Sequence, residues 1–156
     1  GTFTHTWYGS KSGISGEGNW RLVTYVDMKK VWRDDSTGLL WSDIVGVDSF
    51  TNALGKAPES LEELETLCMN KPDYKNPALG KIMDSKVKWR LPNKQEVLQA
   101  YLNGAGNVLS ESDLNIWTAS YAGDDKAWAI DMSQGVLSKV DIKTDTNIRC
   151  IGVVTE

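Results

Sequence analysis

The sequence predicts a single α+β domain with two main helices packed on an antiparallel sheet. Three observations predict it: two segments with helix-capping residues, alternating apolar and polar residues in the C-terminal third, and a length of 156 residues with 40% apolar composition, enough for one hydrophobic core. We expect residues 19–156 to form this domain. Residues 1–18, rich in Gly, Ser and Thr, are expected to form a connector or stalk-proximal leader.

A strand and a hairpin are expected first. Side chains in residues 19–26 alternate in a way that is typical of a strand with two distinct faces. Residues 30–33 and 39–41 then flank segment 34–38, Asp-Asp-Ser-Thr-Gly, whose residues favour a turn. We interpret its two aspartates as turn formers rather than calcium ligands.

The first main helix is expected after Pro58. Segment 60–63, Ser-Leu-Glu-Glu, has the form of a capping box, and apolar residues follow at helical spacing from Leu61 to Cys68. Several glutamates lie in its first turns, where the helix dipole favours negative charge. We interpret them as a solvated face, not as paired catalytic carboxylates.

A second main helix is expected to begin after Asn93 and to end at Asn103-Gly104. The Asn93 side chain can cap the helix, and Glu96, three residues later, can reach back to the Asn93 backbone. Pro92 lies just outside the helix, where its missing N–H does no harm.

The C-terminal third is expected to be β throughout. Four segments alternate in hydrophobicity and are separated by turn residues: 116–121, 126–132, 135–142 and 147–153. We expect them to form successive antiparallel strands. Long irregular loops are expected before them, at residues 69–88 and 103–115.

Four sequence motifs occur in order within residues 31–154. They are DSTGLLW at 35–41, WRLP at 89–92, IWTAS at 116–120, and AWAID at 127–131 followed by IRCI at 148–151. Together they resemble the motifs of the bacterial Lcl C-terminal domain family. The resemblance implies a C-type-lectin-like fold related to that of formylglycine-generating enzymes, often displayed on surface adhesins that bind glycans.

The resemblance also implies structural roles for residues in these motifs. It assigns to the core Trp41, Trp89, Arg90, Trp117, Trp128 and Arg149. The two cysteines, Cys68 and Cys150, are either buried free thiols or a bridge similar to the long-range disulfide of the C-type-lectin-like fold. We favour the bridge, which would add roughly 4 kcal/mol of stability by closing a long loop and would indicate an oxidising compartment.

Several classes of function are disfavoured. The net charge is −4 with no cluster of Lys or Arg, so we expect no nucleic-acid partner, and no apolar stretch approaches the length needed for membrane insertion. The only histidine, His5, lies in the leader, and the two cysteines are distant in sequence. We therefore expect no catalytic site, no metal site and no cofactor. The sugar-binding calcium motifs of true C-type lectins are also missing.

Recognition by loops and aromatic side chains is the function that we favour. We predict a ligand-binding edge for a glycan or a cell-surface protein, formed by Asp113, Asn115, Tyr121, Asp124, Asp125 and Lys126. The alternative interpretation of these residues is an ordinary solvated hairpin turn.

The overall prediction is a non-enzymatic binding domain at the tip of a bacterial surface or secreted adhesin, as the C-terminal part of a larger exported protein. One alternative is a structural cap that forms a homotrimer through the leader, whose residues Phe3, His5 and Trp7 alternate as in a strand. A second alternative is an enzyme related to formylglycine generation, which would contain free, copper-reactive thiols.

Overall fold

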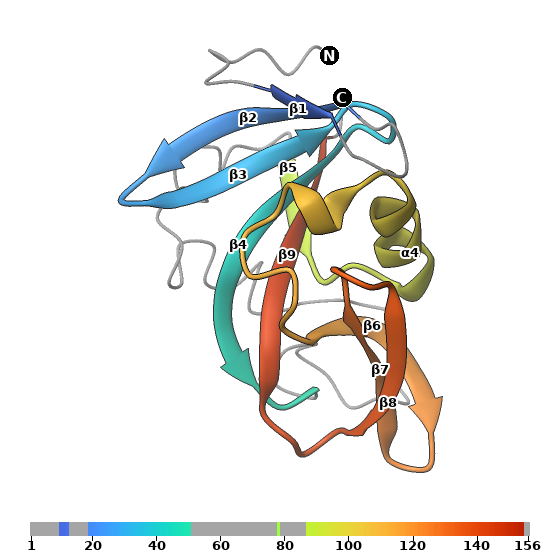
Figure 1. The fold of residues 1–156 in the computed structure, drawn as a ribbon. Coiled ribbons are helices and arrows are strands. Elements are labelled where there is room, and N and C mark those ends of the chain that lie inside the picture. The colour runs from blue at the N-terminus through green and yellow to red at the C-terminus, as the bar shows by residue number, and fades with distance from the viewer. Residues whose placement is uncertain (1–9, 13–18, 51–77, 79–86, 155–156) are drawn as a thin grey trace.

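A computed structural model describes residues 10–12, 19–50, 78 and 87–154 (Figure 1). The elements in chain order are β1 (Ser10–Ser12), β2 (Asn19–Val26), β3 (Lys29–Asp34), β4 (Leu39–Asp48), β5 (Val87–Arg90), α4 (Lys94–Leu102), the 3₁₀ helix η1 (Ala105–Asn107), β6 (Ile116–Gly123), β7 (Lys126–Asp131), β8 (Val136–Asp141) and β9 (Thr146–Val154). The nine described strands form one sheet, and α4 lies beside it.

The predicted α+β, C-type-lectin-like fold with two main helices is therefore wrong. The described residues are mostly β-structure and contain one α-helix. The reason is that segments expected to form separate hairpins join one continuous sheet, which itself supplies most of the buried apolar surface. The first predicted helix, at 60–68, lies outside the described residues.

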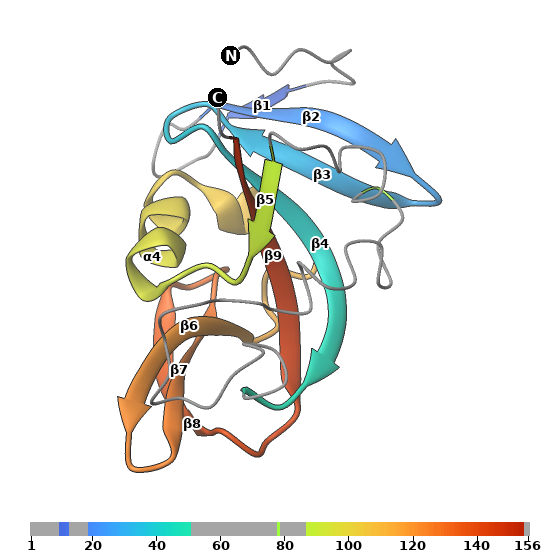
Figure 2. The ribbon, with the colours of Figure 1, turned by 180° about the vertical axis from the view of Figure 1, so that it is seen from behind.

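The order of the strands also differs from the prediction. The sheet runs β1-β2-β3-β4-β9-β6-β7-β8, and β5 pairs with β9 (Figure 2). The predicted succession of antiparallel C-terminal strands holds for β6, β7 and β8 only. β9 instead returns between β4 and β6, antiparallel to β4 and parallel to β6 at Ile116 and Asn147. The last strand is thus a central one.

The predicted hairpin near the N-terminus is confirmed. β3 and β4 pair antiparallel, with Trp32 opposite Trp41. In the turn between them, the backbone N–H of Ser36 donates to Asp34 Oδ1 at 2.9 Å, and Gly38 adopts a φ of +79° that favours glycine. These two features hold the turn in one conformation.

The predicted helix after Asn93 is confirmed, including its cap. Glu96 N donates to Asn93 Oδ1 at 2.8 Å, and Asn93 N donates to Glu96 Oε1 at 2.8 Å. The helix buries Val97 and Ala100 and ends at the expected Asn103. No helix among the described residues is both long enough and apolar enough to cross a membrane.

The sheet separates two apolar clusters. Neighbouring residues of one strand point to opposite faces, so Leu40 belongs to one cluster and Trp41 to the other. α4 and η1 cover the face that carries Trp41, where Val97 and Ala105 join the cluster. This packing fixes α4 over the start of β4, where the candidate site lies.

The predicted disulfide stays a prediction. Cys150 lies on β9 and is fully buried. Its expected partner, Cys68, lies outside the described residues.

Candidate functional site

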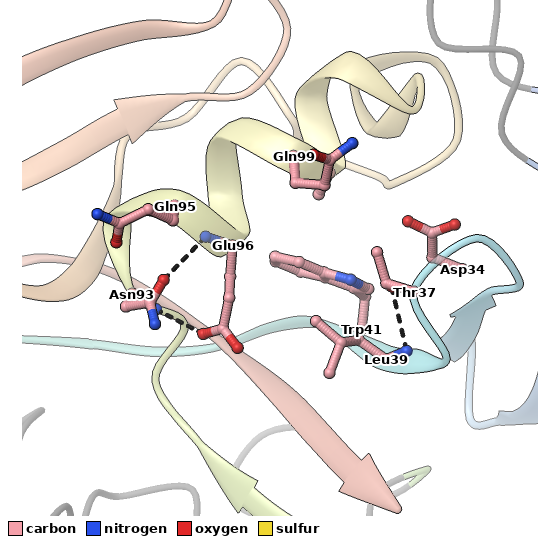
Figure 3. Close-up of a pocket in the computed structure, with 9 residues that line it drawn as sticks. Asp34, Thr37, Leu39, Trp41, Asn93, Gln95, Glu96 and Gln99 are labelled. Carbon is pink, nitrogen blue, oxygen red and sulfur yellow. Dashed lines mark hydrogen bonds between the residues drawn. The ribbon is translucent and has the colours of Figure 1, made fainter.

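A cavity of about 300 Å³ lies between α4 and the turn that joins β3 to β4 (Figure 3). Its lining combines amides, carboxylates, a hydroxyl and apolar surface, from Asp34, Thr37, Leu39, Trp41, Asn93, Gln95, Glu96, Gln99 and Ala100. The two segments that form it contain the DSTGLLW motif and the residues that follow WRLP. The fold thus brings together two motifs that are distant in sequence.

On the helix side of the cavity, three hydrogen bonds fix the carboxylate of Glu96. Arg90 donates to Oε1 at 2.8 Å and to Oε2 at 2.7 Å, and Asn93 N donates to Oε1 at 2.8 Å. The Arg90 and Glu96 side chains are 27% and 19% exposed, so water screens the ion pair and its net contribution to stability is small. Its main effect is to orient Glu96 and to balance its charge.

A polar network that is buried at Asp34 and Asn103 supports another side of the cavity. Gln99 Nε2 donates to Asn103 Oδ1 at 3.1 Å, and Asn103 Nδ2 donates to Asp34 Oδ2 at 2.8 Å. The backbone oxygen of Asn103 also accepts from the indole of Trp20 at 2.9 Å. Because Asp34 is fully buried and Asn103 nearly so, this network holds both in one geometry.

Trp41 contributes a hydrogen-bond donor that has no acceptor in the described part of the chain. Its indole is fully buried, and its Nε1 has no hydrogen-bond partner among the described residues. In Figure 3 the indole lies between Glu96 and Thr37, with its nitrogen at the end nearer to Thr37. A buried donor left without an acceptor costs about 1–3 kcal/mol. Trp41 lines the cavity, so a ligand oxygen that reached this N–H would remove that cost.

The lining favours a ligand with several hydroxyl groups. Amide and carboxylate oxygens accept hydrogen bonds, while amide N–H groups and the Trp41 indole donate them. A hydroxyl group can serve both kinds of partner at once, and Leu39 offers apolar surface to a carbon skeleton. Among the residues that the structure describes, no lysine, arginine or histidine lines the cavity.

Four of the sequence-predicted site residues lie together at the hairpin between β6 and β7. Asp124 and Asp125 form the turn with left-handed φ values of 52° and 56°, and both are exposed, as is Lys126. Asp125 N donates to the hydroxyl of Tyr121 at 3.1 Å, and the Tyr121 ring stacks on Phe50. Tyr121 therefore supports the turn from its own strand.

The other two predicted site residues lie elsewhere. Asp113 and Asn115 are exposed and precede β6, whereas the hairpin follows it. An extended strand of 8 residues, the length of β6, spans roughly 25 Å. The backbone oxygen of Asn115 accepts from Asn147 Nδ2 at 3.1 Å. The structure therefore does not gather the six residues into one site.

The residues predicted to be structural are mostly interior. Trp41, Trp89, Trp117 and Arg149 are buried, and Arg90 is partly buried. Trp128, also predicted to be in the core, is only partly buried. The ammonium groups of Lys94 and Lys139 lie 4.8 Å and 5.4 Å from its ring centroid, so this indole forms part of the sheet surface.

The cavity is not among the binding sites that the sequence predicts. One signal for it was present, since Gln95 and Gln99 are four residues apart and share one face of a capped helix. No local signal shows that the turn containing Thr37 and Leu39 packs against that face.

No protein-family model matches the chain, and no curated protein is significantly similar to it in sequence. The resemblance to the Lcl C-terminal domain family consequently stays a prediction from the four motifs.

Proposed function

We propose that this protein is a non-enzymatic binding domain that recognises a glycan in the cavity beside α4. The observation that carries the proposal is the cavity lining of amides and carboxylates together with Trp41, whose buried indole N–H has no acceptor among the described residues. A sugar hydroxyl supplies the missing acceptor and can donate its own hydrogen to a carboxylate or amide oxygen.

The size of the cavity suits one sugar ring. Its volume of about 300 Å³ is near the lower end of the range for small-molecule sites. We infer that a terminal sugar or one ring of a longer chain enters the cavity, while the rest of the glycan stays outside.

The proposed setting is a bacterial surface or secreted adhesive protein. It is supported by the four motifs, which resemble a family found on adhesins, and by the predicted bridge between Cys68 and Cys150. In that setting the domain presents the cavity to glycans outside the cell.

A glycan array with the full chain and its variants tests the proposal. Trp41→Phe keeps an aromatic ring but removes the donor, so binding is expected to fall about tenfold, the effect of one hydrogen bond. Trp89→Phe is the matched control, because Trp89 is also buried, its Nε1 also lacks a partner among the described residues, and it does not line the cavity. It should bind as the unmodified protein does.

The same array distinguishes the cavity from the hairpin predicted in the sequence analysis. Tyr121→Ala and Asp125→Ala should leave binding unchanged if the cavity is the site. Loss of binding in these two variants, with Trp41→Phe unaffected, would move the site to the hairpin. Uniformly flat signals would contradict glycan recognition.

A second candidate function, assembly of a fibre, is favoured by β1. This strand lies at one end of the sheet and pairs with β2 of its own chain. No described strand pairs with its outer edge, where a strand of another chain could be added. Light scattering should give a trimer that is lost when residues 1–18 are removed; a monomer in both cases would exclude this function.

A further inference from the structure

The cavity contains two carboxylates whose charges are balanced differently. Glu96 forms an ion pair with Arg90 at 2.7 Å. Asp34 is fully buried and forms no ion pair with any described residue; its described partners are the neutral donors Ser36 N and Asn103 Nδ2. No described cation therefore forms an ion pair that neutralises the charge of Asp34.

The next residue shows that cations are available close by. Asp35 accepts from Arg21 at 2.5 Å and also forms an ion pair with Arg33. Asp35 does not line the cavity, whereas Asp34 does. The two arginines therefore balance the charge of Asp35, outside the cavity, and form no ion pair with Asp34, in its wall.

This arrangement determines the sign of the potential inside the cavity. Charged groups in a low-dielectric wall act over longer distances than groups in water, and a cavity lined by charges of one sign attracts the opposite sign. Asp34 need not touch a ligand to have this effect. A negatively charged sugar is disfavoured in such a cavity, and a positively charged group is favoured.

The unpaired donor of Trp41 gives a second, independent requirement. Its N–H needs an acceptor oxygen, which a bare ammonium ion lacks. A suitable ligand carries both an oxygen acceptor and a positive charge. An indole next to the site is also a favourable neighbour for a cation.

We propose that the cavity selects an amino sugar, a hexosamine with a free protonated amine, over the corresponding neutral sugars. This inference rests on the proposed glycan-binding function. It adds that Asp34 determines the preference for charge, while Trp41 contributes to binding of all the sugars.

Isothermal titration calorimetry with glucosamine, glucose and N-acetylglucosamine, at a pH below the pKa of the amine, tests the inference. Glucosamine is expected to bind about tenfold more tightly than the two neutral sugars. One charge interaction across a partly buried site accounts for an affinity difference of about this size. Asp34→Asn should remove this preference, so that the ratio of glucosamine affinity to glucose affinity falls to about one. Asp35→Asn is the matched control and should retain the preference.

A second variant covers the case in which Asp34→Asn does not fold. Gln95 lines the cavity from the exposed side of α4, so Gln95→Lys adds a positive charge without altering the buried network. It should weaken glucosamine binding relative to glucose. Equal binding of the three sugars to the unmodified protein would overturn the charge preference alone. Absence of binding by all three would overturn the proposed function as well.

Discussion

Arg149 shows how a single buried charge connects separate parts of this fold. Its side chain is 1% exposed and donates to the backbone oxygens of Ser42 at 2.7 Å and Ser110 at 2.5 Å. Asp43 lies nearby and accepts from the Ser110 hydroxyl at 2.7 Å. The guanidinium therefore joins β4, β9 and the loop before β6.

Replacing Arg149 should destabilise the protein strongly. Arg149→Met leaves two buried carbonyl oxygens without their donor and removes the positive charge near Asp43, so we expect a loss of about 3–5 kcal/mol in the free energy of unfolding. Urea denaturation measures it. Arg90→Met, which breaks a partly exposed ion pair, should cost about 1 kcal/mol. Equal losses in the two variants would contradict this role of Arg149.

The cost of the Arg149 substitution should not depend on pH over the neutral range. Burial lowers the pKa of Arg149 from its ordinary value to about 10, an effect opposed by the charges of Asp43 and Glu111. Because the pKa is lower in the folded state, the positive charge of Arg149 lowers the free energy of unfolding by a constant amount at every pH below about 10. This penalty decreases only as the pH rises through about 10 and the folded protein loses the proton. The stability difference between the protein and Arg149→Met should therefore stay constant from about pH 6 to 9. A steady change across that range would disprove it.

At the scale of the elements, one glycine fixes how the turn between β7 and β8 meets α4. Gly135 has a φ of +71°, and a Cβ atom there would lie 2.6 Å from the ring of Tyr101. Gly123 has a similar φ of +85°, but nothing lies within 4 Å of its would-be Cβ. The two glycines share a backbone conformation and differ in packing.

Substitution of these glycines should separate backbone strain from packing. Gly123→Ala should cost about 1 kcal/mol, from the left-handed conformation alone. Gly135→Ala should cost about 1–3 kcal/mol more, because the added methyl group displaces Tyr101 and with it the end of α4. Thermal unfolding of both variants checks this. A Gly135 variant as stable as the Gly123 variant would show that the turn and α4 move apart without cost.

The elements that the sequence predicts well are those whose signals are local. Asn93 and Glu96 form the cap of α4 as expected, and residues 34–38 form the expected turn. The fold class fails because the position of β9 between β4 and β6 depends on contacts between residues that are far apart in sequence. Local alternation indicates that a strand forms, but not which strand lies beside it.

The candidate site could be predicted only in part, for the same reason. The cavity needs Asp34 and Thr37 from the turn after β3 and Gln99 from the helix after the WRLP motif, and only the folded chain brings them together. Trp41 was assigned to the core from its motif, and it is buried. The missing acceptor for its indole nitrogen depends on the positions of all its neighbours, which the sequence does not give.

For the whole molecule, the predicted bridge between Cys68 and Cys150 can be tested directly. Titration of the native and the denatured protein with a thiol reagent should find no reactive thiol. Reduction should then lower the free energy of unfolding by roughly 4 kcal/mol, since the bridge would close a long loop. Two thiols detected after denaturation without reductant would rule out the bridge and weaken the proposed extracellular setting.

The central claim is that a sugar occupies the cavity and accepts a hydrogen bond from Trp41. The most direct test is a nuclear magnetic resonance titration that follows the indole N–H signals, assigned through Trp41→Phe and Trp89→Phe, as the best sugar from the array is added. We predict that the Trp41 signal shifts progressively and saturates, while the Trp89 signal stays in place. A saturating shift of backbone signals at the hairpin between β6 and β7, with the Trp41 signal unchanged, would contradict the claim.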